Sequence, residues 1–311
     1  MNILVTSDLH GLESAYRHFA HILRIGTFKC GVIAGDLLED GLTKQEPIEL
    51  LGVTEDDLLP ELPGAEETLE DMMHREITKL HDPNGIFMRT LAIKEKRIKL
   101  ILHSAKKPIF IIRGNHDQTH WQSESNIHNI HWTKLNFNRF NFIGYQHSEF
   151  SRTQEQQRKD FEHLKTFIDN RTVLVSHIPA FGILDRTGHD PSWSLGSKAL
   201  RDLLGHNKPL VHIHGHVHQA SGHKDASFNA SFPVKRQFLC LDLDNLHRLE
   251  WIDPKVKPKP RLYRHESGQV SVHGPFWYDM PTVVIEKYIR MAEKEELENR
   301  LKVYMEQRDD H

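Results

Sequence analysis

Five short apolar runs in this chain each end in a small group of polar residues. The runs cover residues 2–6, 31–34, 108–112, 172–175 and 209–213. Short β-rich runs bounded by turn residues are typical of buried strands. In open α/β sheets, ligands bind beyond the carboxyl ends of the strands. We therefore expect five strand ends to direct polar groups toward one place.

Helical patterns lie between these runs. Residues 12–23 form one, and Phe87, Leu91, Ile98 and Leu102 follow a mostly helical spacing before the third run. Further strands are predicted over 141–145, 227–232 and 237–243, and they would supply a second sheet. The alternation of strands and helices favours a layered α/β domain.

Two parts of the chain fall outside the pattern. The acidic stretch 40–84 is too long for an ordinary connection, and we predict a helical insertion over about 40–105, either beside the site or packed on the sheet edge. Prolines and lysines alternate over 253–261 and predict an extended linker. A long helix with an apolar stripe is expected over 281–311, docked on the domain or on a second copy of the chain. These features divide the chain into 1–250 and 251–311.

Composition excludes several classes of protein. The 311 residues contain 40 Lys and Arg and 43 Asp and Glu, a net charge of −3, which disfavours a protein that coats nucleic acid. No run approaches the roughly 18 apolar residues of a membrane helix. The first residues lack the basic region of a signal peptide and predict a strand. Cys30 and Cys240 form no CxxC pair, which is typical of reduced thiols in a cytoplasmic protein.

The polar groups at the five strand ends are rich in metal-binding side chains. They contain Asp8, His10, Asp36, Asn115, His177, His216 and His218. Carboxylate, imidazole and one amide oxygen suit Mn, Fe, Zn or Co. Seven such side chains exceed the needs of one four-coordinate ion and fit two divalent ions that share a carboxylate. Alternate residues of an extended segment project to one side, which predicts that Asp8 joins His10, and His216 joins His218.

The ordered motifs DLH, GD, GNHD, SH and GHVH resemble the calcineurin-like metallophosphoesterase superfamily over residues 1 to about 245. The resemblance implies an α/β fold, a four-layer α/β-β/α sandwich of two mixed β-sheets flanked by helices. The C-terminal helical extension expected over 281–311 lies outside the resemblance. A dinuclear metal centre would lie at the apex of the sheets. By the same resemblance Asp8, His10 and His218 would hold one ion. Asn115, His177 and His216 would hold the other, and Asp36 would bridge the two.

A hydrolytic mechanism follows from such a centre. Two divalent ions polarise a bridging water to hydroxide, neutralise phosphoryl oxygens and hold the phosphorus for in-line attack. His116 occupies the general-acid position of the superfamily, and Asp117 is expected to orient it and to favour its charged form. Manganese is the metal expected to support activity in vitro.

The substrate is predicted from finer similarities. Residues 184–187, 196–201 and 229–231 resemble small bacterial enzymes related to cyclic-nucleotide phosphodiesterases, which favours a small-molecule or nucleotide phosphodiester. The basic residues of the linker leave a nuclease open, although the net charge weakens it. A phosphomonoesterase and a non-catalytic, metal-binding scaffold stay open as well.

Two further histidines lie two and four residues before His216, so in an extended strand they would project to the same side as His216. His214 is interpreted as a support for the neighbouring ligands, and His212 as a strand residue that packs beneath the site.

Overall fold

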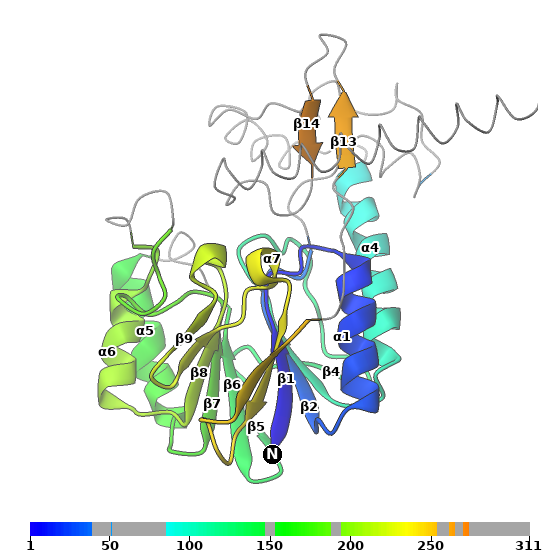
Figure 1. Ribbon diagram of the computed structural model, residues 1–311. Helices are drawn as coiled ribbons and strands as arrows, with labels where there is room; N and C mark the ends of the chain where they lie inside the picture. Colours follow the sequence, from blue (N-terminus) through cyan, green and yellow to red (C-terminus); the bar gives the residue numbers. More distant parts are fainter. Residues whose placement is uncertain are drawn as a thin grey trace, which may run out of the picture.

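The computed structural model describes residues 1–38, 51, 85–146, 153–187, 194–253, 261–264 and 270–273. Within these ranges, two six-stranded sheets lie face to face and helices cover both outer faces (Figure 1). The predicted α/β sandwich of two mixed sheets flanked by helices is confirmed.

The first sheet has the strand order β12-β11-β1-β2-β3-β4. Its strands are β1 (Asn2–Thr6), β2 (Cys30–Ala34), β3 (Ile109–Ile112), β4 (Ile127–Asn129), β11 (Phe238–Asp242) and β12 (Leu249–Ile252). Strands β1 to β4 are parallel to one another, whereas β11 runs antiparallel to both β1 and β12.

The second sheet has the order β5-β6-β7-β8-β10-β9. Its strands are β5 (Leu135–Phe137), β6 (Phe140–Tyr145), β7 (Thr172–Ser176), β8 (Val211–His214), β9 (Gly222–Lys224) and β10 (Ser227–Asn229). Strands β6, β7, β8 and β10 are parallel, and the two edge strands are antiparallel to their neighbours.

Of the helices in the described residues, four form the outer layers (Figure 1). Helices α1 (Glu13–Ile25) and α4 (Ile86–His103) cover the first sheet, and α5 (Gln154–Leu164) and α6 (Lys198–His206) cover the second. The shorter helices are η2 (Lys165–Phe167), η3 (His218–Ala220) and α7 (Phe232–Lys235). Thr153 begins α5 with a reciprocal capping box to Gln156, and the hydroxyl of Ser197 caps α6.

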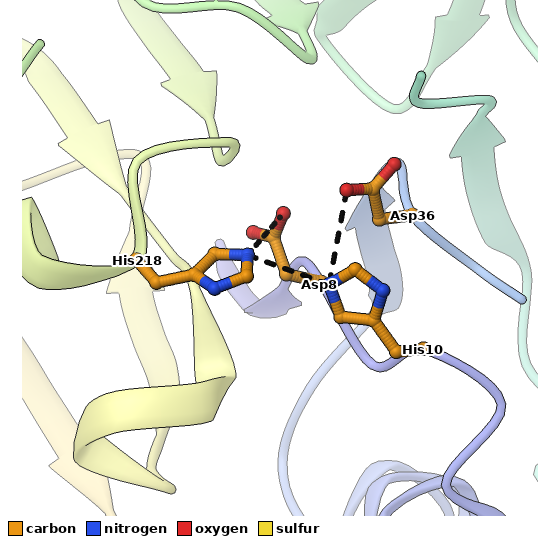
Figure 2. Close-up of side chains that lie close together, drawn as sticks. All are labelled: Asp8, His10, Asp36 and His218. Atoms are coloured by element: carbon orange, nitrogen blue, oxygen red, sulfur yellow. Dashed lines mark hydrogen bonds and ion pairs between the residues drawn. The ribbon is translucent and has the colours of Figure 1, made fainter. Parts of the chain in front are cut away.

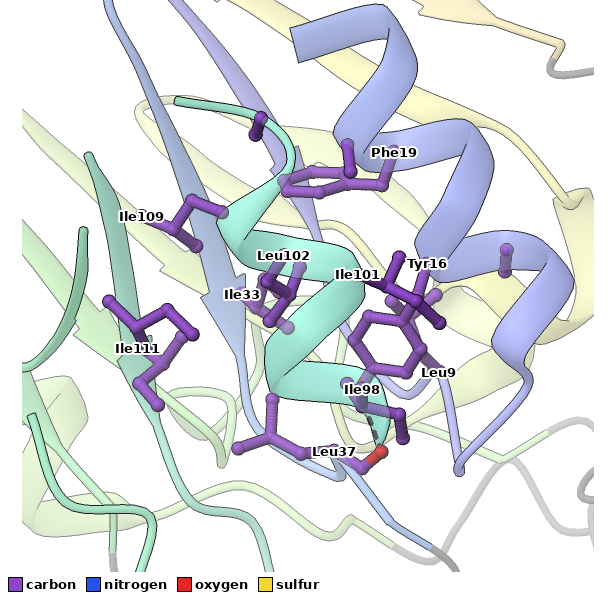
Figure 3. Packing of buried hydrophobic residues seen from close by; sticks show 14 of the residues in the cluster. Leu9, Tyr16, Phe19, Ile33, Leu37, Ile98, Ile101, Leu102, Ile109 and Ile111 are labelled. Carbon is purple, nitrogen blue, oxygen red and sulfur yellow. Dashed lines mark hydrogen bonds between the residues drawn. The ribbon is translucent and has the colours of Figure 1, made fainter. Parts of the chain in front are cut away.

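Strand alternation produces three apolar layers. In β1, Leu4 faces the helices while Ile3 and Val5 face the other sheet, because successive side chains point to opposite faces. Figure 3 shows the layer under α1 and α4, where Tyr16 and Leu102 lie among the buried residues. The middle layer fills the space between the sheets, and the third lies under α5 and α6.

Two sequence predictions need correction. The strand predicted over 227–232 ends at Asn229, and α7 begins at Phe232, where Pro233 favours a first helical turn. The strand predicted over 237–243 does not join the second sheet, since β11 pairs with β1. The helical insertion over about 40–105 stays a prediction; within that range, α4 is a crossover helix between the parallel strands β2 and β3.

Other predictions fall on the remaining residues. The acidic stretch 40–84, apart from Leu51, lies outside the described residues, as do most of the 253–261 linker and the helix predicted over 281–311. Strands β13 (Arg261–Arg264) and β14 (Val270–His273) pair antiparallel. Among the described residues, no helix has the length and apolar character needed to cross a membrane.

Candidate metal centre

The structure brings all seven predicted ligands to the carboxyl ends of five strands. The segments that carry them follow β1 (Asp8, His10), β2 (Asp36), β3 (Asn115), β7 (His177) and β8 (His216, His218). These strands come from both sheets, so the site lies where the two sheets meet. The prediction that five strand ends direct polar groups to one place is confirmed.

Their side chains converge for a different reason from the one that the sequence suggested. Asp8, His10, Asp36 and His216 have positive φ angles of 57°, 43°, 48° and 69°. Each segment therefore leaves extended geometry as its strand ends. Backbone hydrogen bonds hold the turns, including Asp8 N–H to Gly35 O at 3.0 Å and His10 N–H to Asp36 O at 2.9 Å. Strained backbone of this kind persists only where surrounding bonds fix it.

Two glycines permit the close approach of these turns. A Cβ at Gly215 would overlap the Ser7 hydroxyl and the Asp8 carboxylate, and a Cβ at Gly114 would overlap Asp36. Any other residue would push apart the segments that carry the ligands.

One set of ligands, the deep group, consists of Asp8, His10 and His218. All three are buried, and with Asp36 they offer ligand atoms within 4.8 Å of one another (Figure 2). The two imidazole Nε2 atoms lie 3.4 Å apart. Nε2 of His218 also lies 3.3 Å from Oδ1 of Asp8. Such a set of converging carboxylate and imidazole donors is a candidate site for a divalent metal.

The other set, the open group, consists of Asn115, His177 and His216. Oδ1 of Asn115 lies 2.8 Å from Nε2 of His177 and 3.0 Å from Nδ1 of His216. Nδ1 of His177 donates to Ala34 O at 2.9 Å, which leaves Nε2 directed into the site. Asn115 and His216 are half-buried, so this side of the centre is reached from solvent.

Asp36 lies between the two groups. Its Oδ2 is 3.8 Å from Nε2 of His10, and its Oδ1 is 3.3 Å from Nε2 of His177. The carboxylate is 1% exposed. One carboxylate therefore presents an oxygen to each group, which is the arrangement that a bridging ligand needs.

The protonation states of Asp8, Asp36 and His10 suit a cation. Burial alone would raise the pKa of Asp8, but the charge on His218 and its hydrogen bond hold that pKa below the usual range. The pKa of Asp36 is likewise well below the usual range, since His177 and His116 outweigh burial. Burial lowers the pKa of His10 to about 4. Ionised carboxylates and a neutral imidazole are the forms that bind metal.

His177 behaves differently. Burial lowers its pKa, but the charge and hydrogen bond of Asp36, with the charge of Asp8, raise it to about 9. In the metal-free protein His177 is therefore protonated at neutral pH. A cation in the open group would have to displace that proton.

His116 lies at the edge of the centre. Its backbone N–H donates to Oδ1 of Asp36 at 3.0 Å, and its Nε2 lies 3.9 Å from Oδ2 of the same residue. Its ring contacts that of His10 edge to face at 5.2 Å. With a side chain 29% exposed, it combines contact with the candidate ligands and access to solvent.

Asp117 holds the backbone of two loops. Its carboxylate accepts hydrogen bonds from the N–H groups of Leu37 (3.0 Å), Leu38 (2.8 Å) and Gly114 (2.8 Å). Burial and the charge of Asp36 raise the pKa of Asp117 to about 7. It thereby ties the loop after β2 to the loop after β3. Its orientation of His116 stays a prediction.

Three supporting residues were not assigned a role from the sequence. Ser231 donates its hydroxyl to Oδ2 of Asp8 at 2.6 Å, Tyr16 donates to Leu37 O at 2.6 Å, and Asn229 donates to Val217 O at 2.8 Å. Each holds a ligand or a ligand loop from an element distant in the sequence. No local sequence spacing predicts these contacts. The only signal was that residues 229–231 belong to a segment that resembles enzymes related to cyclic-nucleotide phosphodiesterases.

Comparisons with known proteins support this architecture. No curated protein matches the sequence. One solved crystal structure has a TM-score of 0.54 at 16% identity, covering 80% of this chain and 97% of its own. TT1561 of Thermus thermophilus gives 0.46 at 15% identity, over 82% of this chain and 99% of that one. A dimetal phosphatase from Danio rerio gives 0.43 at 10%, over 77% and 91%. The structure with the TM-score of 0.54 supports the fold alone. The other two are too dissimilar to support a conclusion.

The family comparison reaches further. The model of the calcineurin-like phosphoesterases matches residues 1–220, which contain the five strand ends that carry the candidate ligands. That family and the cluster around Asp8 together support divalent metal binding and metal-dependent hydrolysis of phosphoesters. The chain belongs to the calcineurin-like phosphoesterase family.

Proposed function

We propose that this protein is a phosphodiesterase with two divalent metal ions, acting on a small-molecule or nucleotide phosphodiester. The observation that carries the proposal is the position of Asp36, with one carboxylate oxygen toward His10 and the other toward His177. A single-metal site would need only one of the two groups that this carboxylate faces.

Each group of residues has a role in the proposal. The deep group would hold one ion, the open group would hold the other, and Asp36 would contact both. Ions in such a pair activate water and neutralise the phosphoryl oxygens. Manganese is the ion proposed for activity in vitro, because nitrogen and carboxylate ligands without thiolates suit it.

The leaving group needs a proton, and His116 is proposed to donate it. Its side chain reaches solvent while its backbone N–H is fixed by Asp36, so the ring stands where a bound ester would meet it. Imidazole is the side chain best suited to transfer a proton near neutral pH. Asp117 supports this arrangement by fixing the backbone at Gly114, two residues before His116.

A cytoplasmic location and self-association complete the proposal. Cys30 is a buried free thiol and Cys240 a partly buried one, which fits a reducing compartment. Pairing of two chains through residues 281–311 is a prediction from the apolar stripe of the sequence.

The test is hydrolysis of bis-(p-nitrophenyl) phosphate relative to p-nitrophenyl phosphate. Metal-stripped protein would be reconstituted with manganese, and p-nitrophenol release would be followed at equal substrate concentrations. We expect the diester to react faster, which would justify assays of cyclic nucleotides. Asp36→Asn protein purified in the same way would measure any contaminating phosphatase.

Three different outcomes would each favour another function. Faster release from the monoester would make the protein a phosphomonoesterase. Cleavage of single-stranded DNA, with binding that weakens steeply as salt rises, would favour a nuclease. If the protein binds two manganese ions but hydrolyses none of these esters, a metal-binding scaffold would be favoured.

A further inference from the structure

His212 is a buried imidazole that the proposed chemistry does not use. It lies on β8, four residues before His216, and it is 1% exposed. In the sheet it pairs with Leu174, which belongs to the apolar layer under α5 and α6. His212 therefore stands on the outer face of the second sheet, stacked on His214 with ring centroids 4.9 Å apart.

Both ring nitrogens of His212 have hydroxyl partners. Nε2 lies 2.8 Å from Oγ of Ser176, and Nδ1 lies 3.3 Å from Oγ of Ser227. Burial and the charge of His214 lower the pKa of His212 well below its ordinary value, so the ring is neutral and has one N–H.

The position of that N–H follows from the hydrogen bonds of Ser176. The Ser176 hydroxyl donates to Ile178 O at 2.5 Å, which leaves only its lone pairs for His212. Nε2 of His212 is therefore the donor to Ser176. Its Nδ1 accepts from Ser227, and every group in the chain of bonds is used once.

This chain of bonds reaches a candidate ligand. Ser176 and Ile178 flank His177, so the Ser176 hydroxyl closes a bond across the residue that carries the ligand. A second bond, from Gly215 N–H to His177 O at 3.1 Å, joins the same residue to the segment that carries His216. The backbone of His177 is thus fixed from both sides.

Directional bonds in a buried site fix an orientation more narrowly than apolar packing does. We propose that His212 is a positioning residue: through Ser176 it holds the backbone of His177 and so sets the affinity of the open group for its metal ion. The proposal rests on the proposed two-metal function. It names a residue that touches neither substrate nor metal.

The test compares binding of two manganese ions to metal-stripped variants. Calorimetric titration would give both affinities, and electron paramagnetic resonance would distinguish a coupled manganese pair from a single ion. We expect the open group to be the weaker of the two sites, because two of its three residues are half-buried. In His212→Leu the affinity of this weaker site should fall about 10- to 100-fold, the range for residues that orient metal ligands. The affinity of the deep group should stay within about threefold of its wild-type value. The coupled signal should give way to that of a single ion at manganese concentrations that fill both sites in the wild type.

Smaller changes separate positioning from general damage to the fold. Ser176→Ala removes only the hydroxyl and should weaken the same ion as His212→Leu. His212→Gln retains an N–H near the position of Nε2 and should restore binding to within about threefold of the wild type. Ser104→Ala, the matched control, removes a hydroxyl that is bonded to Ile101 O at the end of α4, outside this chain of bonds, and should leave both affinities unchanged.

The results that overturn the proposal are distinct from those that overturn the function. Equal loss of both ions in His212→Leu and Ser176→Ala, or no loss of either, would refute the positioning role. Wild-type protein that binds a single ion would refute both the positioning role and the two-metal function. Wild-type protein that binds two ions but hydrolyses no ester would refute the function, while selective loss of the weaker ion would still support His212.

Discussion

The two halves of the centre share one edge of the fold but differ in burial and charge. The deep group is buried throughout and contains the carboxylate of Asp8. The open group has an amide and two imidazoles, and two of its three residues are half-buried. Among the described residues, the carboxylate that it faces is that of the shared Asp36. We therefore expect the deep group to bind its ion more tightly, and the open group to be the side that substrate approaches.

Protonation widens this difference. Burial lowers the pKa of His10 to about 4, whereas the charge of Asp36 helps to raise that of His177 to about 9. At neutral pH a cation enters the deep group without displacing a proton from His10. In the open group the proton on His177 competes with it. Similar side chains at similar strand ends thus acquire different chemistry from the charges that surround them.

Removing the shared carboxylate should have the largest effect. Asp36→Asn keeps the size of the side chain but loses the charge that both groups use, so we expect turnover to fall at least about 1000-fold. Manganese content should fall at both sites. Rates on bis-(p-nitrophenyl) phosphate and metal analysis would check this.

Asp160→Asn is the matched control, because this aspartate lies on α5, where its carboxylate accepts a hydrogen bond from Tyr145. It should change neither quantity. Full occupancy and an unchanged rate in Asp36→Asn would show that the carboxylate does not join the two halves.

Loss of His116 should separate chemistry from metal binding. His116→Ala should retain both ions and slow substrates with poor leaving groups about 100-fold, because these depend most on a proton donor. Esters of p-nitrophenol should lose less, since p-nitrophenolate leaves without a proton. The measurement is kcat for an alkyl and a p-nitrophenyl diester.

His120→Ala removes an exposed histidine four residues further on and should behave as the wild type. An equal loss on both esters in His116→Ala would remove the general-acid role and leave only a structural one.

The pH dependence of metal binding should distinguish the halves directly. Below pH 9, affinity in the open group should fall about tenfold per pH unit, because one proton on His177 competes with the ion. The affinity of the deep group should fall less steeply over the same range, because His10, with a pKa of about 4, has no proton to lose. Manganese titrations at three pH values would give both slopes, and equal slopes would contradict the comparison.

The same raised pKa has a consequence for the metal-free protein. His177 has a pKa of about 9 when folded, against an ordinary value of 6.5, so its contribution to stability is complete below pH 6.5. That contribution is lost as the pH rises through 9. Urea unfolding at pH 6 and pH 9.5, compared between wild type and His177→Asn, would detect it.

The sequence predicted the site better than it predicted the connections. Each of the five ligand segments follows a short apolar run, and local composition is enough to predict those runs. Local composition does not predict the strand with which β11 pairs, because an apolar run of that length fits either sheet. Its pairing with β1 depends on packing across more than 230 residues of chain.

The supporting contacts escaped prediction for a related reason. Ser231 meets Asp8 across 223 positions of sequence, and no spacing rule connects them. The left-handed backbone at Asp8 and His10 was also missed, because aspartate and histidine are compatible with both extended and turn geometry. Local sequence thus predicts which side chains reach the site, whereas the long-range bonds decide how they are held.

The smallest effect should come from a support of the deep group. Ser231→Ala removes the hydroxyl that donates to Oδ2 of Asp8 at 2.6 Å. Asp8 keeps its bonds from the His216 N–H at 3.1 and 3.2 Å, so the carboxylate stays in place and only part of its orientation is lost. We expect the tighter manganese affinity to fall by about tenfold or less, the low end for residues that orient ligands.

Ser231→Ala is the counterpart of His212→Leu: it should weaken binding of the ion in the deep group, whereas His212→Leu should weaken binding of the ion in the open group. Ser104→Ala, which removes a hydroxyl bonded to Ile101 O at the end of α4, is the control and should leave both affinities unchanged. Weakening of the open group by Ser231→Ala would mean that the two halves respond as one unit, because the His216 segment bonded to Asp8 would have moved with it. Weakening of the deep group alone would show that the open group keeps its geometry when the orientation of Asp8 is disturbed, although the Asp8 carboxylate is bonded to the His216 N–H.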